Sequence, residues 1–238
     1  MRPKRYSRVV LKISGESLCR ETEHGIDSGS LTAIASEIKA AHAGGAQIGV
    51  VLGAGNIWRG ATDRGSAIGR VTADNMGMLA TIINALALQD ALEHMLVATR
   101  VQTAIEIPKV AEAYIRRRAI RHMEKGRIVI FAGGTGNPYF TTDTAAALRA
   151  VEIEAEALLK ATKVDGVYSA DPHLDRKAKK FERLSFMDSI KNRLRVMDAT
   201  ALTLCMENHL PVVVFNLGVK GNIARAVNGQ NVGTIITE

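Results

Sequence analysis

The chain of 238 residues is 47% hydrophobic and 23% charged, as in ordinary globular proteins, and its formal net charge is +7. No apolar run reaches the roughly eighteen residues that a membrane span requires, and the basic N-terminus leads into a short strand pattern instead of a signal peptide, so we expect a cytoplasmic protein without membrane contacts. The charge favours anionic partners. Nucleic acid is one possibility, but the basic residues are dispersed and few aromatic side chains are available for stacking, and nucleotides or phosphorylated metabolites fit equally well.

The first predicted strand is interrupted by one charge. Residues 8–18 form the pattern of a buried strand that runs into a Ser14-Gly15 turn, with Lys12 inside the apolar run. Lys12 is either the charge of an edge strand or a functional cation near the carboxyl end of a strand, where open α/β sheets bind ligands. The sequence leaves both interpretations open.

A strand-helix-strand unit comes next. Apolar residues at helical spacing predict a helix over residues 30–43, ended by Gly44-Gly45, and residues 46–52 predict the next buried strand. A connection of this length implies that the two strands are parallel. The second strand ends in a glycine loop, residues 53–60, where Arg59 is either placed to reach a ligand or is a solvated surface arginine.

Residues 72–95 predict a long helix that is apolar around most of its circumference. Such a helix must be buried, either centrally or against a second subunit. Asp74 lies in the first turn, where a carboxylate complements the helix dipole. A short strand over residues 97–101 and a helix over residues 111–125 follow. The helix carries three adjacent arginines, Arg116 to Arg118, which we expect on a solvated face.

Another glycine loop, residues 133–143, lies between a strand pattern at residues 127–132 and a helix pattern. Its three glycines let backbone N–H groups come close to a ligand. Thr141, Thr142 and Asp143 predict a capped helix start, and the periodic apolar positions that follow are Ala145, Leu148, Val151, Ala155 and Leu158. This arrangement suits an anionic group, although an ordinary strand-to-helix turn has the same glycines.

The remaining pattern completes an α/β chain. We expect a strand over residues 157–162, a turn at Asp165-Gly166, an exposed connection over 173–183, a helix over 197–208, a strand over 210–215, a helix over 219–227 and a strand over 234–236. No repeat or linker interrupts the chain, so one continuous α/β/α domain over residues 1–238 is the expected organisation.

The sequence shows no motif for a metal site or a disulfide framework. Cys19 and Cys205 lie far apart without a CxxC or Cys/His pairing, and the six histidines have no motif around them. His173, between Asp171 and Asp175, is expected to be a solvated loop residue. We therefore expect no metal held by protein ligands alone.

Three predicted strands are followed by glycine-containing loops, namely the Ser14-Gly15 turn and residues 53–60 and 133–143. In a parallel sheet these loops lie on the same edge. Two glycine loops there could hold two phosphate groups, with Lys12 and Arg59 neutralising charge between them. Phosphoryl transfer requires little more than in-line positioning and charge stabilisation. The sequence GxxxxGK[ST] is absent and neither glycine loop completes GxGxxG, which disfavours a P-loop kinase and a dinucleotide-binding dehydrogenase.

These motifs, taken together and in order, carry a family resemblance. The matching segments are residues 11–16, 53–60, 74–81, 134–143, 159–168 with Asp171-Pro172, and 196–198. The chain resembles bacterial uridylate (UMP) kinases of the amino acid kinase superfamily from end to end. The resemblance implies a three-layer α/β/α sandwich with a mainly parallel central sheet. It also implies transfer of the γ-phosphoryl group of ATP to UMP, with Mg²⁺.

The resemblance also implies roles for individual residues. The catalytic positions are Lys12, Arg59, Asp143 and Asp198, of which the two aspartates would organise Lys12 or magnesium. The ATP positions are Lys12, Ile13, Ser14, Gly15, Gly55, Arg59, Thr162, Tyr168 and Asp171. The UMP positions are Ala54, Asp74, Thr135, Gly136, Asn137, Pro138, Tyr139, Phe140, Thr141 and Thr142. Magnesium would be held mainly by ATP phosphates and water.

The sequence departs from the family at several positions. Ala54 stands where a glycine is common and Trp58 where phenylalanine is usual. The family is typically hexameric, built from dimers, with GTP as activator and UTP as inhibitor. Gln89 and Glu93 occupy positions where an arginine and a histidine can occur, while Arg100 remains, so GTP activation does not follow from the resemblance.

Other functions remain as alternatives. Relatives in the superfamily act on amino acids or carbamate and share the first lysine-serine-glycine turn. A non-catalytic nucleotide sensor or nucleic-acid-binding regulator is a second class, motivated by the charge of +7. Lys12 together with both glycine loops favours the enzyme.

Overall fold

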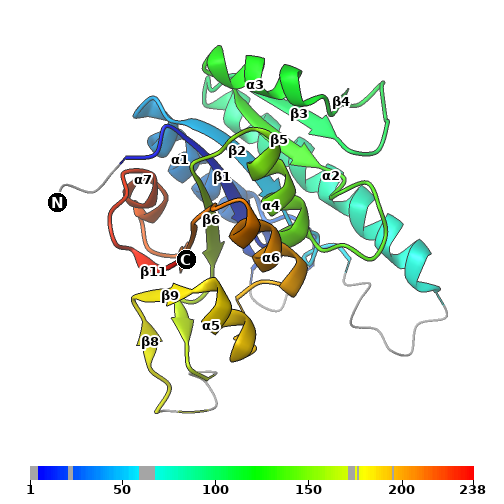
Figure 1. The fold of residues 1–238 in the computed structure, drawn as a ribbon. Helices are drawn as coiled ribbons and strands as arrows, with labels where there is room; N and C mark the ends of the chain where they lie inside the picture. Colours follow the sequence, from blue (N-terminus) through cyan, green and yellow to red (C-terminus); the bar gives the residue numbers. More distant parts are fainter. Residues whose placement is uncertain (1–4, 21–23, 59–67, 171–174, 176, 195) are drawn as a thin grey trace.

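The computed structural model describes residues 5–20, 24–58, 68–170, 175, 177–194 and 196–238. A nine-stranded sheet forms its centre, in the order β4-β3-β5-β2-β1-β6-β10-β11-β9, and helices cover both faces of this sheet (Figure 1). All of its pairings are parallel except that of β10 with β11. The expected α/β fold with a mainly parallel central sheet is confirmed.

The central sheet contains β1 (Arg8–Ile13), β2 (Gln47–Leu52), β3 (Thr99–Thr103), β4 (Glu112–Ala113), β5 (Ile128–Ala132), β6 (Ala157–Thr162), β9 (Arg183–Ser185), β10 (Val212–Asn216) and β11 (Gly233–Thr237). The helices are η1 (Gly15–Leu18, 3-10), α1 (Ser28–Ala43), α2 (Arg70–His94), α3 (Arg116–Glu124), α4 (Thr142–Glu152), α5 (Phe186–Lys191), α6 (Ala199–Glu207) and α7 (Asn222–Val227). A separate two-stranded antiparallel sheet pairs β7 (Val167–Tyr168) with β8 (Lys180–Phe181).

Strand β1 lies in the middle of the sheet, paired with β2 on one side and β6 on the other. The interpretation of Lys12 as an edge-strand charge is therefore wrong. Alternate residues of β1 enter two different cores. Val9 and Leu11 pack with residues of α1, α2 and α7, whereas Val10 packs with residues of α3, α4 and α6. Lys12 lies two residues after Val10, so it points to the face covered by α4 and α6.

Several predicted boundaries were wrong. The helix expected from residue 111 begins at Arg116, because Glu112 pairs with Gln102 of β3 as the short edge strand β4. The helix after residue 141 ends at Glu152, and Ala155 and Leu158 lie beyond it. The exposed connection over residues 173–183 contains β8, and α5 was not anticipated.

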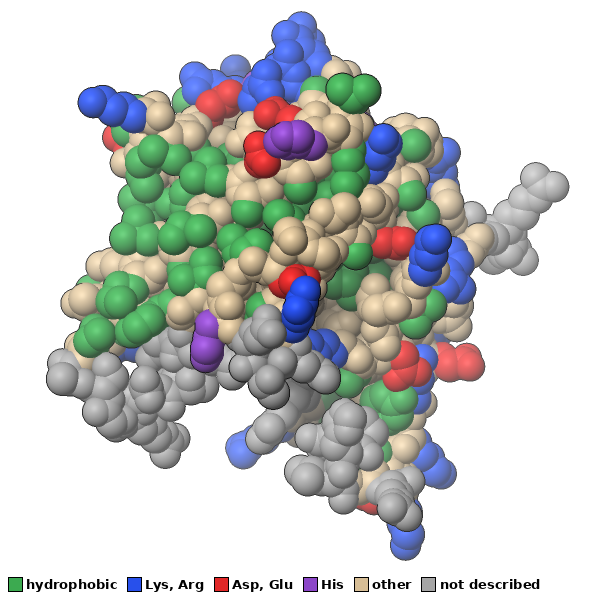
Figure 2. Space-filling view, turned by 180° about the vertical axis from the view of Figure 1, so that it is seen from behind, with side chains coloured by type: hydrophobic (Ala, Val, Ile, Leu, Met, Phe, Trp, Pro, Cys, Tyr) green, Lys and Arg blue, Asp and Glu red, His purple; other side chains and the backbone are tan. Residues whose placement is uncertain are grey.

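Helix α2 has two different sides. Its buried side includes Thr81, Asn84 and Leu88, while Val71, Leu79 and Ile83 are 45%, 47% and 51% exposed. Figure 2 shows hydrophobic side chains gathered on the side of the molecule where α2 lies. By length and composition α2 could cross a membrane, but this is weak evidence, because core helices share these properties and 44% of its most apolar stretch is buried.

Candidate active site

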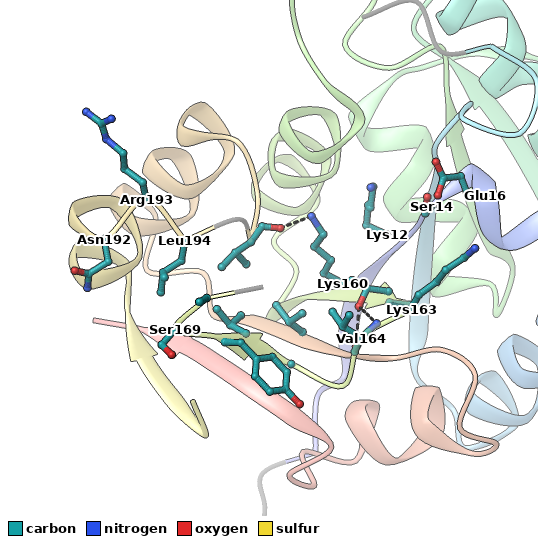
Figure 3. A pocket seen from close by; sticks show the side chains of 18 residues that line it. Lys12, Ser14, Glu16, Lys160, Lys163, Val164, Ser169, Asn192, Arg193 and Leu194 are labelled. Carbon is teal, nitrogen blue, oxygen red and sulfur yellow. Dashed lines mark hydrogen bonds between the residues drawn. The ribbon is translucent and has the colours of Figure 1, made fainter. Parts of the chain in front are cut away.

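A cavity of about 730 Å³ opens at the carboxyl ends of β1, β6 and β10, where the strand loops meet (Figure 3). It is lined by Lys12, Ser14, Glu16, Lys160, Ala161, Thr162, Lys163, Val164, Gly166, Val167, Tyr168, Ser169, Ala170, Asn192, Arg193, Leu194, Val196 and Val214. Figure 3 shows Ser14 and Glu16 on one side of the cavity and Asn192 to Leu194 on the other. The lining combines apolar walls with lysines, which suits a ligand having an apolar ring and anionic groups.

Two lysines of neighbouring strands meet one carboxylate beside this cavity. Lys12 of β1 and Lys160 of β6 are partners in the parallel register. The Nζ atom of Lys12 lies 2.8 Å from Oδ1 of Asp143, and Nζ of Lys160 lies 2.5 Å from Oδ2 of the same residue. Lys160 also donates to the carbonyl oxygen of Val196. Asp143 comes from the first turn of α4, so the start of this helix fixes both ammonium groups.

The electrostatics of this cluster follow from burial and from the paired charges. The side chains of Lys12, Lys160 and Asp143 are 11%, 12% and 14% exposed. Burial raises the pKa of Asp143, but the two lysines lower that pKa by more, so the net direction is down. Burial lowers the pKa of Lys160, and Asp143 offsets this only in part. The cluster carries two cations for one anion, which makes it a site for further negative charge.

Asp198 joins the starts of two helices. Its Oδ1 atom accepts the N–H of Ala201 at 3.0 Å, so Asp198 is the N-cap of α6. The hydroxyl groups of Thr141 and Thr144 also donate to its carboxylate, the latter at 2.9 Å. Asp198 therefore aligns α4, which carries Asp143, with α6.

The 133–142 loop is shaped by glycines and by the cap of α4. Gly133, Gly134 and Gly136 all have positive φ, and a Cβ atom on Gly136 would lie 3.1 Å from the carbonyl oxygen of Ala104. The hydroxyl of Thr141 accepts the N–H groups of Asp143 and Thr144, which confirms the predicted helix cap. The loop thus turns closely between β5 and α4, as the glycine pattern predicted.

The same loop is tied to α2 through Asp74. The Oδ2 atom of Asp74 accepts the N–H of Tyr139 at 2.8 Å and pairs with Nε of Arg70 at 2.7 Å. Tyr139 has a φ of 74°, and Tyr139 and Phe140 are 66% and 51% exposed. Because α2 begins at Arg70, Asp74 lies beyond the first turn, and the predicted role at the helix dipole is wrong. Asp74 instead holds the tip of the loop.

The 53–58 loop, the described part of the other glycine loop, packs directly on the turn after β1. A Cβ atom on Gly15 would lie 2.6 Å from the carbonyl oxygen of Gly53 and 2.7 Å from the N atom of Gly55. Only glycine fits at position 15 without displacing that backbone. Ala54 is not among the described residues with positive φ, so its methyl group requires no left-handed conformation.

The sequence and structure comparisons agree with this geometry. A family model described as the amino acid kinase family matches residues 7–216. This chain belongs to the amino acid kinase family. The structure of UMP kinase from Bacillus anthracis has a TM-score of 0.95 and 41% identity, covering 98% of this chain and 97% of that chain.

Two further solved structures extend the comparison. UMP kinase from Ureaplasma parvum has a TM-score of 0.92 and 40% identity, covering 100% of both chains. Uridylate kinase from Archaeoglobus fulgidus has a TM-score of 0.75 and 31% identity, covering 96% of this chain and 99% of that chain. The fold of this amino acid kinase is thus shared over its whole length.

The predicted site residues of this amino acid kinase fall into three groups. The cavity is lined by Lys12, Ser14, Thr162 and Tyr168. Ile13 is buried at the end of β1, and Gly15 packs against the backbone of Gly55. The residues predicted for UMP lie along the two glycine loops and α2, outside the cavity lining. Arg59 and Asp171 lie outside the described residues, as does His173.

Sequence reasoning missed part of the amino acid kinase site. Lys160 was treated only as a strand residue, although a lysine within an apolar strand is the same signal that singled out Lys12. Asn192, Arg193 and Leu194 had no recognisable pattern, because they enter the cavity from the end of the unpredicted helix α5. Cys19 and Cys205 are both free thiols, as expected.

Proposed function

We propose that this amino acid kinase transfers the γ-phosphoryl group of ATP to UMP, giving ADP and UDP. The observation that carries the proposal is that Lys12 and Lys160, which both line the cavity, contact one buried carboxylate, that of Asp143. Two cations at this point suit the negative charge that spreads over a transferring phosphoryl group. The full-length similarity to UMP kinases supports UMP as acceptor.

The chemistry requires no general base. An oxygen of the UMP phosphate, already ionised at neutral pH, attacks the γ-phosphorus atom, and the bond to the oxygen that bridges the β- and γ-phosphorus atoms breaks. Lys12 and Lys160 stabilise the developing charge, while Asp143 keeps both ammonium groups in place. Asp198 aligns the helix that carries Asp143, and its negative charge also favours the charged form of Lys160.

The two nucleotides are assigned to different parts of the site. ATP occupies the cavity, with its phosphates near Ser14 and the backbone of Gly15 and Gly55, and with Thr162 and Tyr168 on the nucleoside side. UMP is assigned to Asp74 and the 133–142 loop, with Ala54 near its phosphate. Backbone N–H groups of glycine turns supply donors for these anions.

Magnesium fits this site as an ion carried by the nucleotide. Among the described residues, no group of three or more His, Cys, Asp and Glu side chains could hold a metal ion. Asp143 and Asp198 already have lysine, hydroxyl and backbone partners. Mg²⁺ prefers phosphate oxygens and water, and when bound it neutralises charge on the β- and γ-phosphates.

Trp58 adds a contact that the usual phenylalanine cannot make. Its Nε1 atom donates to the carbonyl oxygen of Ala73 at 2.9 Å, which fastens the 53–58 loop to α2. Trp58 is therefore compatible with the proposed activity.

Self-association through α2 is part of the proposal. Val71, Leu79 and Ile83 form an exposed apolar stripe on this helix, at spacings that place them on one side. A second copy covering the stripe would give a dimer, and a homohexamer built from such dimers is the expected assembly. The proposed substrates also imply a cytoplasmic enzyme of pyrimidine nucleotide synthesis.

GTP and UTP are candidate effectors. The Nη1 atom of Arg100 lies 3.4 Å from a carboxylate oxygen of Glu93, which also accepts a hydrogen bond from Gln89 at 3.3 Å. Because Arg100 is already paired, an anionic effector here would have to displace Glu93. GTP activation therefore stays an open prediction for this chain.

The proposal is tested by the choice of acceptor. ADP formation from ATP is measured with UMP, CMP, acetylglutamate, aspartate and carbamate under identical conditions. Activity with an amino acid or carbamate but not with UMP would assign the chain to another branch of the family. DNA binding that persists at raised salt, without phosphoryl transfer to any acceptor, would support the non-catalytic regulator, because purely phosphate-driven binding weakens steeply with salt.

A further inference from the structure

Both glycine loops are fastened to the same helix, α2, by buried polar side chains. The hydroxyl of Thr81 accepts the N–H of Gly133 at 2.9 Å, and it donates to the carbonyl oxygen of Met78 at 2.6 Å. Thr81 is 3% exposed, so water does not replace this bond. The first residue of the 133–142 loop is thereby attached to the middle of α2.

The 53–58 loop is attached one turn further along α2. The Nδ2 atom of Asn84 donates to the carbonyl oxygen of Gly53 at 2.8 Å and to Oδ1 of Asn56 at 2.8 Å. Asn56 returns a bond to Oδ1 of Asn84 at 2.9 Å and donates to the carbonyl oxygen of Gly25 at 2.8 Å. Both asparagines are buried, and their amide groups satisfy one another and the loop backbone.

The spacing on α2 gives these contacts a common geometry. Thr81 and Asn84 are three residues apart, and Asp74 precedes Thr81 by seven, so all three lie on one side of the helix. The strands β2 and β5 that lead into the two loops are neighbours in the sheet. A single rigid helix therefore sets how far apart the loops are and how they are rotated relative to one another.

We propose that Thr81 and Asn84 are positioning residues, which hold the two loops in the relative placement that aligns the acceptor phosphate with the phosphoryl group. This inference rests on the proposed function, in which the loops hold phosphates and acceptor nucleotide. Neither side chain lines the cavity: Thr81 holds loop backbone, and Asn84 holds both loop backbone and the side chain of Asn56. In-line transfer is sensitive to such placement, since a displacement of about 1 Å can cost about 100-fold in rate.

The test uses the full-length enzyme and compares Thr81→Val with two matched variants. Thr81→Ser keeps the hydroxyl group. Thr99→Val removes the hydroxyl of another fully buried threonine, which donates to the carbonyl oxygen of Val97 at 3.0 Å and touches neither loop. Turnover, the dissociation constants of ATP and UMP, and the ratio of UDP to ADP formed are measured well below each melting temperature.

We expect Thr81→Val to lower kcat about tenfold or more and to lower the UDP-to-ADP ratio, because a misplaced acceptor lets water compete for the phosphoryl group. Thr81→Ser should restore both values to within about threefold of wild type, and Thr99→Val should leave the ratio unchanged. Asn84→Asp, which loses both donated bonds, gives the same test if Thr81→Val does not fold. Losses matching those of Thr99→Val, at an unchanged ratio, would overturn the proposal.

The outcome is separable from that of the proposed function. A wild-type enzyme that does not phosphorylate UMP contradicts the choice of acceptor without reference to any variant. The comparison of variants is then made with the acceptor that the wild-type enzyme uses.

Discussion

Lys12 and Lys160 lie side by side on the parallel strands β1 and β6, and each contacts a different oxygen of the Asp143 carboxylate. Two ammonium groups this close repel one another, and the carboxylate between them offsets that repulsion. An incoming phosphoryl group completes the charge balance.

Removal of the first lysine should affect turnover far more than binding. Lys12→Ala is expected to lower kcat by about 100- to 1,000-fold, the usual effect of losing one group that stabilises transition-state charge. The dissociation constant of UMP, measured by titration calorimetry, should change by less than about threefold. Lys39→Ala is the control, since Lys39 donates to the carbonyl oxygen of Met95, away from the site. Equal losses in turnover and UMP affinity would contradict this role.

The two lysines should act as a unit. Lys160→Met is expected to lower kcat by about tenfold to 100-fold. Because Lys12 and Lys160 share one carboxylate, the double variant should lose less than the product of the two single losses. Single-turnover rates of all four enzymes measure this coupling. Strictly multiplicative losses would show that the two ammonium groups act independently.

The stability of the fold should depend on the ionisation of Asp143. The net pKa of this carboxyl group lies below its ordinary value of 3.8, because Lys12 and Lys160 outweigh the opposing effect of burial. The unfolded chain therefore binds more protons in this range, so the stabilisation is present above about pH 4 and is lost as the pH falls through the lowered pKa. The free energy of unfolding, measured by urea denaturation at a series of pH values, should fall less steeply with decreasing pH for Asp143→Asn than for wild type.

The same variant gives a second measurement at neutral pH. Asp143→Asn leaves two buried ammonium groups without their anion, and we expect it to lower the free energy of unfolding by about 3–5 kcal/mol. A variant as stable as wild type, with an identical acid profile, would show that Asp143 does not compensate these charges.

Asp74 should act on the acceptor. Asp74→Asn weakens the hydrogen bond from the N–H of Tyr139. We expect the dissociation constant of UMP to rise about tenfold and that of ATP to rise less. Asp90→Asn is a matched control on the same helix, because Asp90 is 74% exposed and pairs only with His94 among the described contacts. Equal weakening of both nucleotides would argue against an acceptor role.

Self-association should depend on the apolar stripe of α2. A Leu79→Lys, Ile83→Lys variant places charges where a second copy would bury them, and we expect a smaller assembly by light scattering during size-exclusion chromatography. Leu96→Lys is the control, because Leu96 is 95% exposed and lies beyond the end of the helix. An unchanged molar mass of the double variant would place the subunit interface elsewhere.

Local sequence patterns predicted most of the elements and part of the site. The glycines of the 133–142 loop and the Thr141 cap were identified, because capping and positive φ depend on a few adjacent residues. Errors occurred where tertiary contacts override local preference, as at β4, which pairs with β3 in a stretch that resembles a helix.

By itself, the sequence determined that an apolar strand carries Lys12 near its end, that two glycine loops follow other strands, and that the whole pattern is that of a kinase family. Only the tertiary structure decided that β1 is central, that Lys160 and Asp143 are the partners of Lys12, and that Thr81 and Asn84 connect α2 to the loops. These contacts depend on strand register and helix packing between distant segments, which no local pattern encodes.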